Sequence, residues 1–229
     1  MSQLFDDRIE YDFKLPTQKD LPVLILAHPH PLYGGSMENK IIDQVYRRSL
    51  EKGWGALRFN FRGVGKSIGS YDEGKGELND FLDLASHAID QASDQSSRII
   101  LLGYSFGAWI VFQSIRYLKT SLHAVIGVAP PTNLFKFDHY PNKLQKIVFA
   151  AENDELAKLP SVKQWFHTLD EPKHLEIVKN ADHFFVGHTS NLIKKIFHCI
   201  DKTLEYFFVG HTSNLIKKIF HCIDKTLEE

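Results

Sequence analysis

The sequence predicts an α/β fold in which a mostly parallel, twisted sheet is flanked by helices. Two segments, Pro22–Ala27 (PVLILA) and Arg98–Gly103 (RIILLG), are continuous apolar runs of the kind found in strands buried on both faces. Segments with helical periodicity alternate with such runs along the chain, which is typical of parallel sheets with helical crossovers. The length of 229 residues fits one such domain.

The individual elements follow from local patterns. Residues Arg8–Leu15 alternate in polarity and predict an edge strand. Short apolar runs predict the other strands, at Pro22–Ala27, Gly55–Phe61, Arg98–Gly103, His123–Ala129, Leu144–Ala151 and Lys173–Lys179. Apolar residues at helical spacing predict helices at Met37–Lys52, Glu77–Gln91, Phe106–Lys119 and Ser161–Leu169. The link Pro130–Lys143 is too short for a cap domain, so we expect a three-layer sandwich with no cap.

Composition and charge exclude several classes of function. The 27 Lys and Arg residues are balanced by 28 Asp and Glu residues, for a net charge of −1, which argues against nucleic acid or an anionic membrane as partner. No apolar run approaches the roughly 20 residues that a membrane helix needs, and the N-terminus MSQLFDDRIE lacks a secretory signal pattern. Two cysteines are too few for a disulfide framework. We therefore expect a cytoplasmic protein, and its oligomeric state stays open.

The end of the chain contains a duplication. The segment Phe184–Glu205 (FFVGHTSNLIKKIFHCIDKTLE) recurs letter for letter as Phe207–Glu228. Solenoid repeats diverge and need three or more copies, so an identical terminal pair is not a solenoid. We expect one domain over residues 1–206 and a surplus helical copy over residues 207–229.

A short motif in residues 103–107 (GYSFG) carries the sharpest functional signal. It fits G-x-S-x-G between an apolar strand and a helix, the context of a nucleophile elbow. A serine becomes a nucleophile when an imidazole removes its proton and a carboxylate orients that ring. Asp154 and His183 each come directly after a predicted strand, in the order Ser, Asp, His. We predict Ser105 as nucleophile, His183 as base and Asp154, in preference to its neighbours Glu152 and Glu155, as the orienting acid.

The chain also resembles the α/β-hydrolase superfamily, and more narrowly its dienelactone-hydrolase-like bacterial serine hydrolases. The stretches that carry the resemblance are His28–Lys40 (HPHPLYGGSMENK), Arg58–Glu77 (RFNFRGVGKSIGSYDEGKGE), Gly103–Ala108 (GYSFGA), Ala151–Leu156 (AENDEL) and Ala181–Phe185 (ADHFF). The resemblance implies the same nucleophile, acid and base. The namesake of the group uses a cysteine where this chain has Ser105, which argues against dienelactone as the substrate.

Backbone N–H groups are expected to form the oxyanion hole. One belongs to Phe106, after the nucleophile, and the other to the loop after Pro22–Ala27, where His30 and Leu32 are donors because the two prolines have no N–H. The resemblance to a His-Gly-x pattern favours His30. A metal site at His28 and His30 is the weaker interpretation, since no third ligand is evident. The glycine-rich segment NFRGVGKS lacks the first glycine of a phosphate-binding loop, so we expect no metal and no cofactor.

The predicted activity is hydrolysis of small carboxylic esters through an acyl-enzyme. Tyr33, Phe135, Phe137 and Tyr140 are candidates for the apolar lining around the substrate, although packing explains them equally well. Two alternatives remain: a non-catalytic binding protein with this fold, or a thioesterase, peptidase or acyltransferase that uses the same three residues.

Overall fold

The computed structural model describes residues 2–94, 98–118, 122–138 and 141–205. Contacts divide the chain into two units, Met1–Thr189 and Ser190–Glu229. In the second unit, residues 190–205 are helical, and no more of it is described. The predicted surplus copy at 207–229 and the boundary after residue 206 lie outside the described residues and stay predictions.

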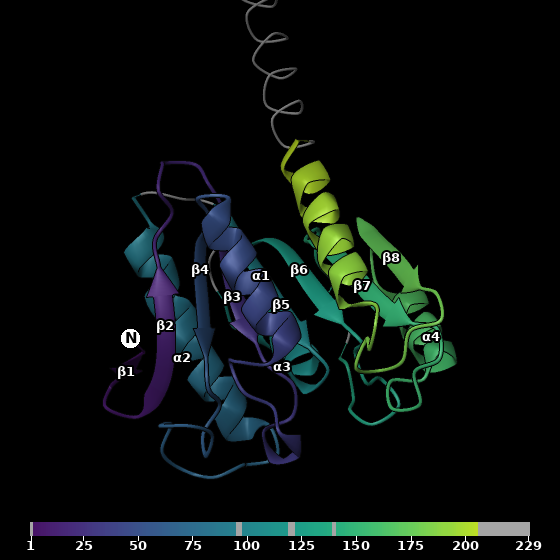
Figure 1. Ribbon diagram of the computed structural model, residues 1–229, viewed down its shortest axis with the longest axis horizontal. Coiled ribbons are helices and arrows are strands. Elements are labelled where there is room, and N and C mark those ends of the chain that lie inside the picture. The colour runs from purple at the N-terminus through teal and green to yellow at the C-terminus, as the bar shows by residue number, and fades with distance from the viewer. Residues whose placement is uncertain (1, 95–97, 119–121, 139–140, 206–229) are drawn as a thin grey trace, which may run out of the picture. The chain divides into compact units, whose positions relative to one another are not determined.

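Within the described ranges of the first unit, eight strands form one sheet in the order β1-β2-β4-β3-β5-β6-β7-β8 (Figure 1). The bounds are β1 Gln3–Phe5, β2 Ile9–Lys14, β3 Val23–Ala27, β4 Gly55–Phe59, β5 Ile99–Tyr104, β6 Leu122–Val128, β7 Gln145–Ala151 and β8 Lys173–Val178. All neighbours from β4 through β8 are parallel, whereas β1 and β2 are antiparallel to their neighbours. The predicted mostly parallel sheet is confirmed.

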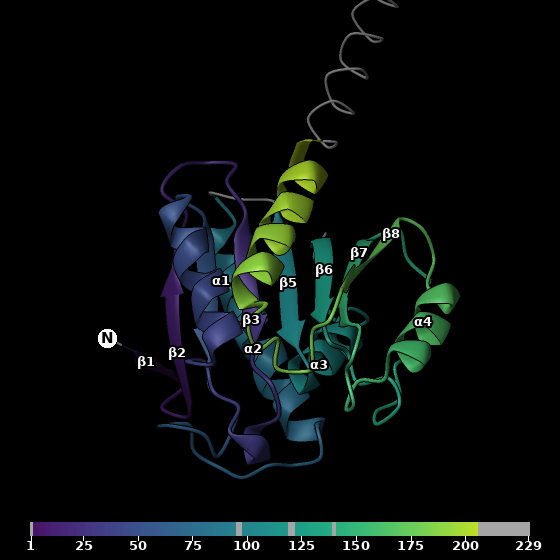
Figure 2. The same ribbon diagram turned by 45° about the vertical axis from the view of Figure 1, so that its right-hand side comes forward.

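Helices cover both faces of this sheet. Their bounds are α1 Lys40–Glu51, α2 Lys75–Ala92, α3 Phe106–Ser114 and α4 Leu159–Thr168. Helix α1 lies on one face, and α2 and α3 lie together on the other (Figure 1 and Figure 2). The rings of Phe112 in α3 and Trp165 in α4 are 5.0 Å apart, which places α4 beside α3. Among the described residues, no helix has the length and apolar character needed to cross a membrane.

Three predicted boundaries need correction. The segment predicted as an edge strand is β2, which pairs with β4 on one side and with the three-residue strand β1 on the other, so β1 is the edge. Helix α1 begins at Lys40 rather than Met37, because the Asn39 side chain caps it by accepting the N–H of Ile41 at 3.0 Å. Helix α3 ends at Ser114, whose hydroxyl donates to the carbonyl of Val111 at 2.8 Å.

The core of the sheet fixes where the functional loops meet. All five residues of β3 are fully buried, as expected for a strand covered on both faces. Because β3 to β8 run in parallel, the loops that follow them leave from the same edge. The motif after β5 therefore lies at the same edge as the loops after β3, β7 and β8.

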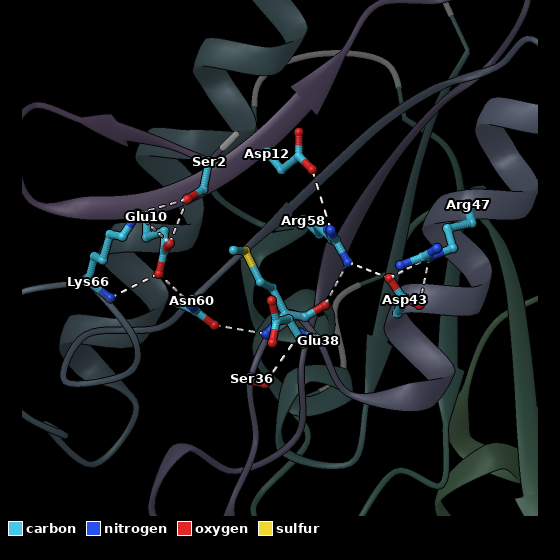
Figure 3. Close-up of polar contacts among 11 residues, drawn as sticks. Ser2, Glu10, Asp12, Ser36, Glu38, Asp43, Arg47, Arg58, Asn60 and Lys66 are labelled. Carbon is cyan, nitrogen blue, oxygen red and sulfur yellow. Dashed lines mark hydrogen bonds and ion pairs between the residues drawn. The ribbon is translucent and has the colours of Figure 1, made fainter.

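A buried polar cluster holds the glycine-rich loop after β4 (Figure 3). The amide of Asn60 donates to Glu10 at 2.8 Å and accepts the N–H of Met37 at 2.8 Å. The same Glu10 carboxylate accepts the backbone N–H of Lys66 at 2.9 Å. Gly65 has φ +58°, and a Cβ there would collide with Asn60 and Glu10. The glycines therefore allow this loop to close over a carboxylate.

Candidate active site

The turn between β5 and α3 presents Ser105 in a backbone conformation that few side chains adopt. Its φ is +55° and its ψ −116°, and its N–H donates to the carbonyl of Val128 at 2.8 Å. A Cβ at Gly103 would collide with the backbone of Gly107, and one at Gly107 would collide with the carbonyl of Ala27. Both glycines of the motif are thus required by close approach of β3, β5 and α3.

The structure brings the three predicted residues together. The Nε2 atom of His183 is 3.0 Å from Ser105 Oγ, and its Nδ1 is 2.8 and 3.0 Å from the two carboxylate oxygens of Asp154. Since a carboxylate only accepts, Nδ1–H donates to Asp154, and Nε2 is left to accept the Ser105 hydroxyl. Asp154 and His183 are 7% and 6% exposed, while Ser105 is half-buried and so open to a reactant.

Backbone donors hold the Asp154 carboxylate in this orientation. Its Oδ1 accepts the N–H groups of Leu156 at 2.9 Å and Ala157 at 2.6 Å. The neighbouring Glu152 turns elsewhere and accepts the N–H of Asn180 at 2.8 Å. Glu155, the other acid of this loop, is exposed. Asp154 is therefore the acid of this loop that contacts the imidazole.

A tyrosine that the sequence analysis did not single out connects the two loops. The hydroxyl of Tyr104, the residue before Ser105, donates to the backbone carbonyl of His183 at 2.8 Å. Its side chain is 2% exposed, and burial raises its pKa, so the hydroxyl remains a donor. The only sequence signal was its place inside the G-x-S-x-G motif.

The side chains of the two residues expected to supply the oxyanion donors pack together. Phe106 begins α3, and the His30 ring is 4.9 Å from the Phe106 ring. His30 and Leu32 are the two candidate donors in the loop after β3, and the N–H of Leu32 already donates to Nδ1 of His30 at 3.2 Å. In the described part of the chain, the N–H groups of His30 and Phe106 have no acceptor. Burial lowers the pKa of His30, so its ring stays neutral, with the hydrogen on Nε2.

His28 uses both ring nitrogens inside the protein. Nε2 accepts the N–H of Phe61 at 3.0 Å, so Nδ1–H donates to the carbonyl of Pro29 at 2.6 Å. Burial lowers the pKa of this fully buried imidazole to about 3. His28 therefore has no lone pair left for a metal ion. Within the described ranges, no group of three or more His, Cys, Asp or Glu residues could hold a metal.

Two of the four predicted substrate residues lie near this site, whereas Phe137 packs elsewhere, with its ring 4.7 Å from that of Trp165. The Tyr33 ring, 85% exposed, is 4.7 Å from the His30 ring, and the Phe135 ring is 5.7 Å from the Phe106 ring. Tyr140 lies outside the described residues. Two further rings near the site were not predicted from the sequence: Tyr71, whose ring is 4.8 Å from that of His30, and Trp109, which stacks on Phe135 at 4.6 Å.

Comparisons with known proteins agree with the fold. No family model matches the chain. An uncharacterized protein of Rickettsia prowazekii is 32% identical over 203 residues, which span 83% of this chain and 83% of that protein. A solved structure of a protein of unknown function from Agrobacterium tumefaciens, described as an α/β hydrolase, matches with a TM-score of 0.80 and 29% identity. That match covers 86% of this chain and 92% of the other.

Two further solved structures carry more specific descriptions. An α/β serine hydrolase without a lid from Xanthomonas campestris has a TM-score of 0.76 and 29% identity, with 85% of this chain and 88% of that chain covered. An α/β serine hydrolase homologue from Coxiella burnetii has a TM-score of 0.67 and 31% identity, with 81% and 88% covered.

The chain therefore belongs to the α/β-hydrolase superfamily. The predicted three-layer fold without a cap domain is confirmed. Within the superfamily, these structural relatives are described as serine hydrolases, and the general function of the chain is that of a hydrolase.

Proposed function

We propose that the protein hydrolyses small carboxylic esters through an acyl-enzyme at Ser105. The observation that carries this proposal is the continuous hydrogen-bonded chain from the Asp154 carboxylate through the His183 ring to the Ser105 hydroxyl. A binding protein has no use for a serine held against a buried imidazole–carboxylate pair. The narrower resemblance to dienelactone-hydrolase-like proteins stays a prediction.

The first half of the reaction forms the acyl-enzyme. Ser105 Oγ attacks the ester carbonyl carbon while Nε2 of His183 takes the hydroxyl proton. The charge that develops on the ring is stabilised by Asp154, which also holds the tautomer that leaves Nε2 free to accept. The C–O bond to the alcohol then breaks, and His183 returns the proton to the departing oxygen.

The second half uses water in place of the serine. Nε2 of His183 takes a proton from a water molecule, the hydroxide adds to the acyl carbon, and the Ser105 oxygen leaves with the proton. In both halves the carbonyl oxygen becomes an oxyanion. The N–H groups of Phe106 and His30, which have no acceptor among the described residues, are our candidates for its donors, because fixed donors of this kind typically contribute about 3–4 kcal/mol to the transition state. These steps involve no metal and no cofactor.

The size of the substrate follows from the loops around the site. The link after β6 is a short loop rather than a cap domain, which favours a small ester open to solvent on one side. Tyr33 and Phe135 are the described residues that we propose to contact its apolar part. Tyr140 stays a prediction from the sequence.

A serine-directed probe and one variant test this proposal. The wild type is expected to react with a fluorophosphonate at Ser105 and to hydrolyse 4-nitrophenyl acetate. Ser105→Ala is expected to lose labelling and to lower turnover by roughly 10⁴-fold or more. Unchanged turnover in this variant would overturn the mechanism, and an unlabelled, inactive wild type would indicate the binding-protein alternative. If Ser105 is labelled but the protein cleaves thioesters or peptides faster than esters, or transfers the acyl group instead of hydrolysing it, the roles of the three residues stand and the proposed substrate class is wrong.

A further inference from the structure

An aromatic cluster surrounds His30 beside the proposed nucleophile. The rings of Tyr33, Tyr71 and Phe106 are 4.7, 4.8 and 4.9 Å from the His30 ring. Phe135 joins the cluster at 5.7 Å from Phe106, and Trp109 stacks on Phe135 with an interplanar angle of 21°. We call this set the His30 cluster; its members are His30, Tyr33, Tyr71, Phe106, Trp109 and Phe135.

Most of the His30 cluster is open to a ligand. Phe106 is fully buried and forms its base, whereas Tyr33 is 85% exposed and the other members are half-buried. A half-buried residue leaves part of its surface in water. That surface is available to a group that arrives at Ser105, since Phe106 is the next residue in the chain.

Hydrogen bonds from the surrounding loops keep the cluster rigid. The indole N–H of Trp109 and the amide of Gln113 both donate to the carbonyl of Lys136 at 2.9 Å, which fastens the loop after β6 to α3. On the other side of the cluster, the buried Glu77 carboxylate accepts the N–H groups of Asp72 and Gly74 at 2.9 and 2.8 Å, directly after Tyr71. Trp109 and the backbone after Tyr71 are therefore held in place before a ligand arrives, which lowers the entropy lost on binding.

The reaction geometry assigns this cluster to one side of the scissile bond. Under the proposed mechanism, His183 returns a proton to the alcohol oxygen, so the alcohol lies on the His183 side, where the exposed Phe184 ring is 5.4 Å from the imidazole. The carbonyl oxygen faces the N–H groups of Phe106 and His30. We infer that the remaining substituent of the carbonyl carbon, the acyl group, lies beside the His30 cluster, whose rings flank these N–H groups.

We propose that the preferred acyl group is aromatic, so that the substrates are esters of aryl carboxylic acids. This inference rests on the proposed function and deepens it. In the step concerned, Ser105 Oγ bonds to the aroyl carbon, the alcohol leaves with the proton from His183, and water later releases the aryl carboxylic acid. Offset or edge-to-face ring contacts contribute beyond the burial of apolar area, which corresponds to a roughly 2- to 12-fold preference for an aryl group over a saturated ring of equal size.

A pair of esters matched in ring size tests the inference. The probes are 4-nitrophenyl benzoate and 4-nitrophenyl cyclohexanecarboxylate, and each kcat/KM is divided by the rate constant of alkaline hydrolysis of the same ester. The wild type is expected to favour the benzoate by roughly 2- to 12-fold. Phe135→Leu keeps an apolar side chain and is expected to move this ratio toward one.

The matched control lies two residues further along the same loop. Phe137 belongs to a separate group of rings, 6.0 Å from Phe112 and 4.7 Å from Trp165, so Phe137→Leu is expected to leave the ratio unchanged. If Phe135→Leu does not fold, Tyr33→Leu replaces it, since a side chain that is 85% exposed contributes little to folding. A wild-type ratio of one, or equal loss in Phe135→Leu and Phe137→Leu, would overturn the inference. In that outcome, hydrolysis of 4-nitrophenyl acetate that depends on Ser105 would leave the proposed function standing, whereas no hydrolysis of any ester would remove both.

Discussion

Acidification is expected to destabilise the protein through His28. The perturbation is the substitution His28→Gln, compared with the wild type over a range of pH. Glutamine offers an acceptor for the N–H of Phe61 but does not titrate. The wild type should lose stability relative to this variant as the pH falls, because the folded protein cannot take up the proton that the unfolded chain accepts.

The magnitude follows from the two pKa values of the imidazole. The pKa is 6.5 for an unperturbed histidine and about 3 for the buried His28. Between these values the unfolded chain holds one more proton than the folded protein, so the free energy of unfolding falls as the pH falls, by about 1.4 kcal/mol per pH unit. From pH 7 to about pH 4 the wild type should lose about 3 kcal/mol relative to His28→Gln. Above pH 7 the difference between the two proteins should be constant.

Urea unfolding at several pH values measures this difference, and the other titrating groups cancel between the two proteins. A difference that stays constant from pH 7 to pH 4 would refute the reasoning. The NMR titration of the His28 ring in the wild type gives a second measurement that does not depend on the variant. A midpoint near pH 6 would contradict the two hydrogen bonds that occupy its nitrogens.

Two more predictions concern the reaction. Asp154→Asn should lower kcat/KM for 4-nitrophenyl acetate by roughly 10⁴-fold at neutral pH, because an amide no longer stabilises the imidazolium and can select the wrong ring tautomer. Glu152→Gln in the same loop is the control. A loss of less than tenfold in Asp154→Asn would contradict the role proposed for this carboxylate. Tyr104→Phe removes the hydrogen bond to the His183 carbonyl and should lower kcat about 3- to 10-fold with little change in KM, since a net hydrogen bond contributes about 1 kcal/mol. The control Tyr11→Phe removes a hydroxyl that donates to Gln3 at 2.8 Å on the outer strands, and equal kinetics in the two variants would refute a positioning role for Tyr104.

Much of this architecture could be predicted because each signal is local. The buried parallel strands are continuous apolar runs, and the elbow is a five-residue motif between a strand and a helix. Of the three proposed catalytic residues, Ser105 is predicted from that motif. Asp154 and His183 are predicted from their places directly after strands, because parallel strands end at one edge of the sheet. Asp154 was preferred over its acidic neighbours, and the backbone donors at Leu156 and Ala157 now give a physical reason for that preference.

The features that were missed depend on contacts between distant segments. Strand β1 has only three residues and exists through its pairing with β2. The apolar pattern of α2 did not predict that two of its acids, Glu77 and Asp80, are buried. The burial of Asp80 is compensated by two hydrogen bonds from Arg62, which lies in the loop after β4. The hydroxyl of Tyr104 reaches a carbonyl 79 residues away. No periodicity in the sequence records such pairs.

Gly103 and Gly107 have a consequence for how this protein can diversify. A Cβ at either position would collide with backbone rather than with side chains, so the height of the Ser105 hydroxyl above the sheet is set by main-chain packing among β3, β5 and α3. Residues on the loops after β3 and β6 can then be exchanged without displacing that oxygen. Substitutions in these two loops can therefore change which substrate is preferred while the attacking oxygen stays in place, so these loops are where selectivity can be redesigned.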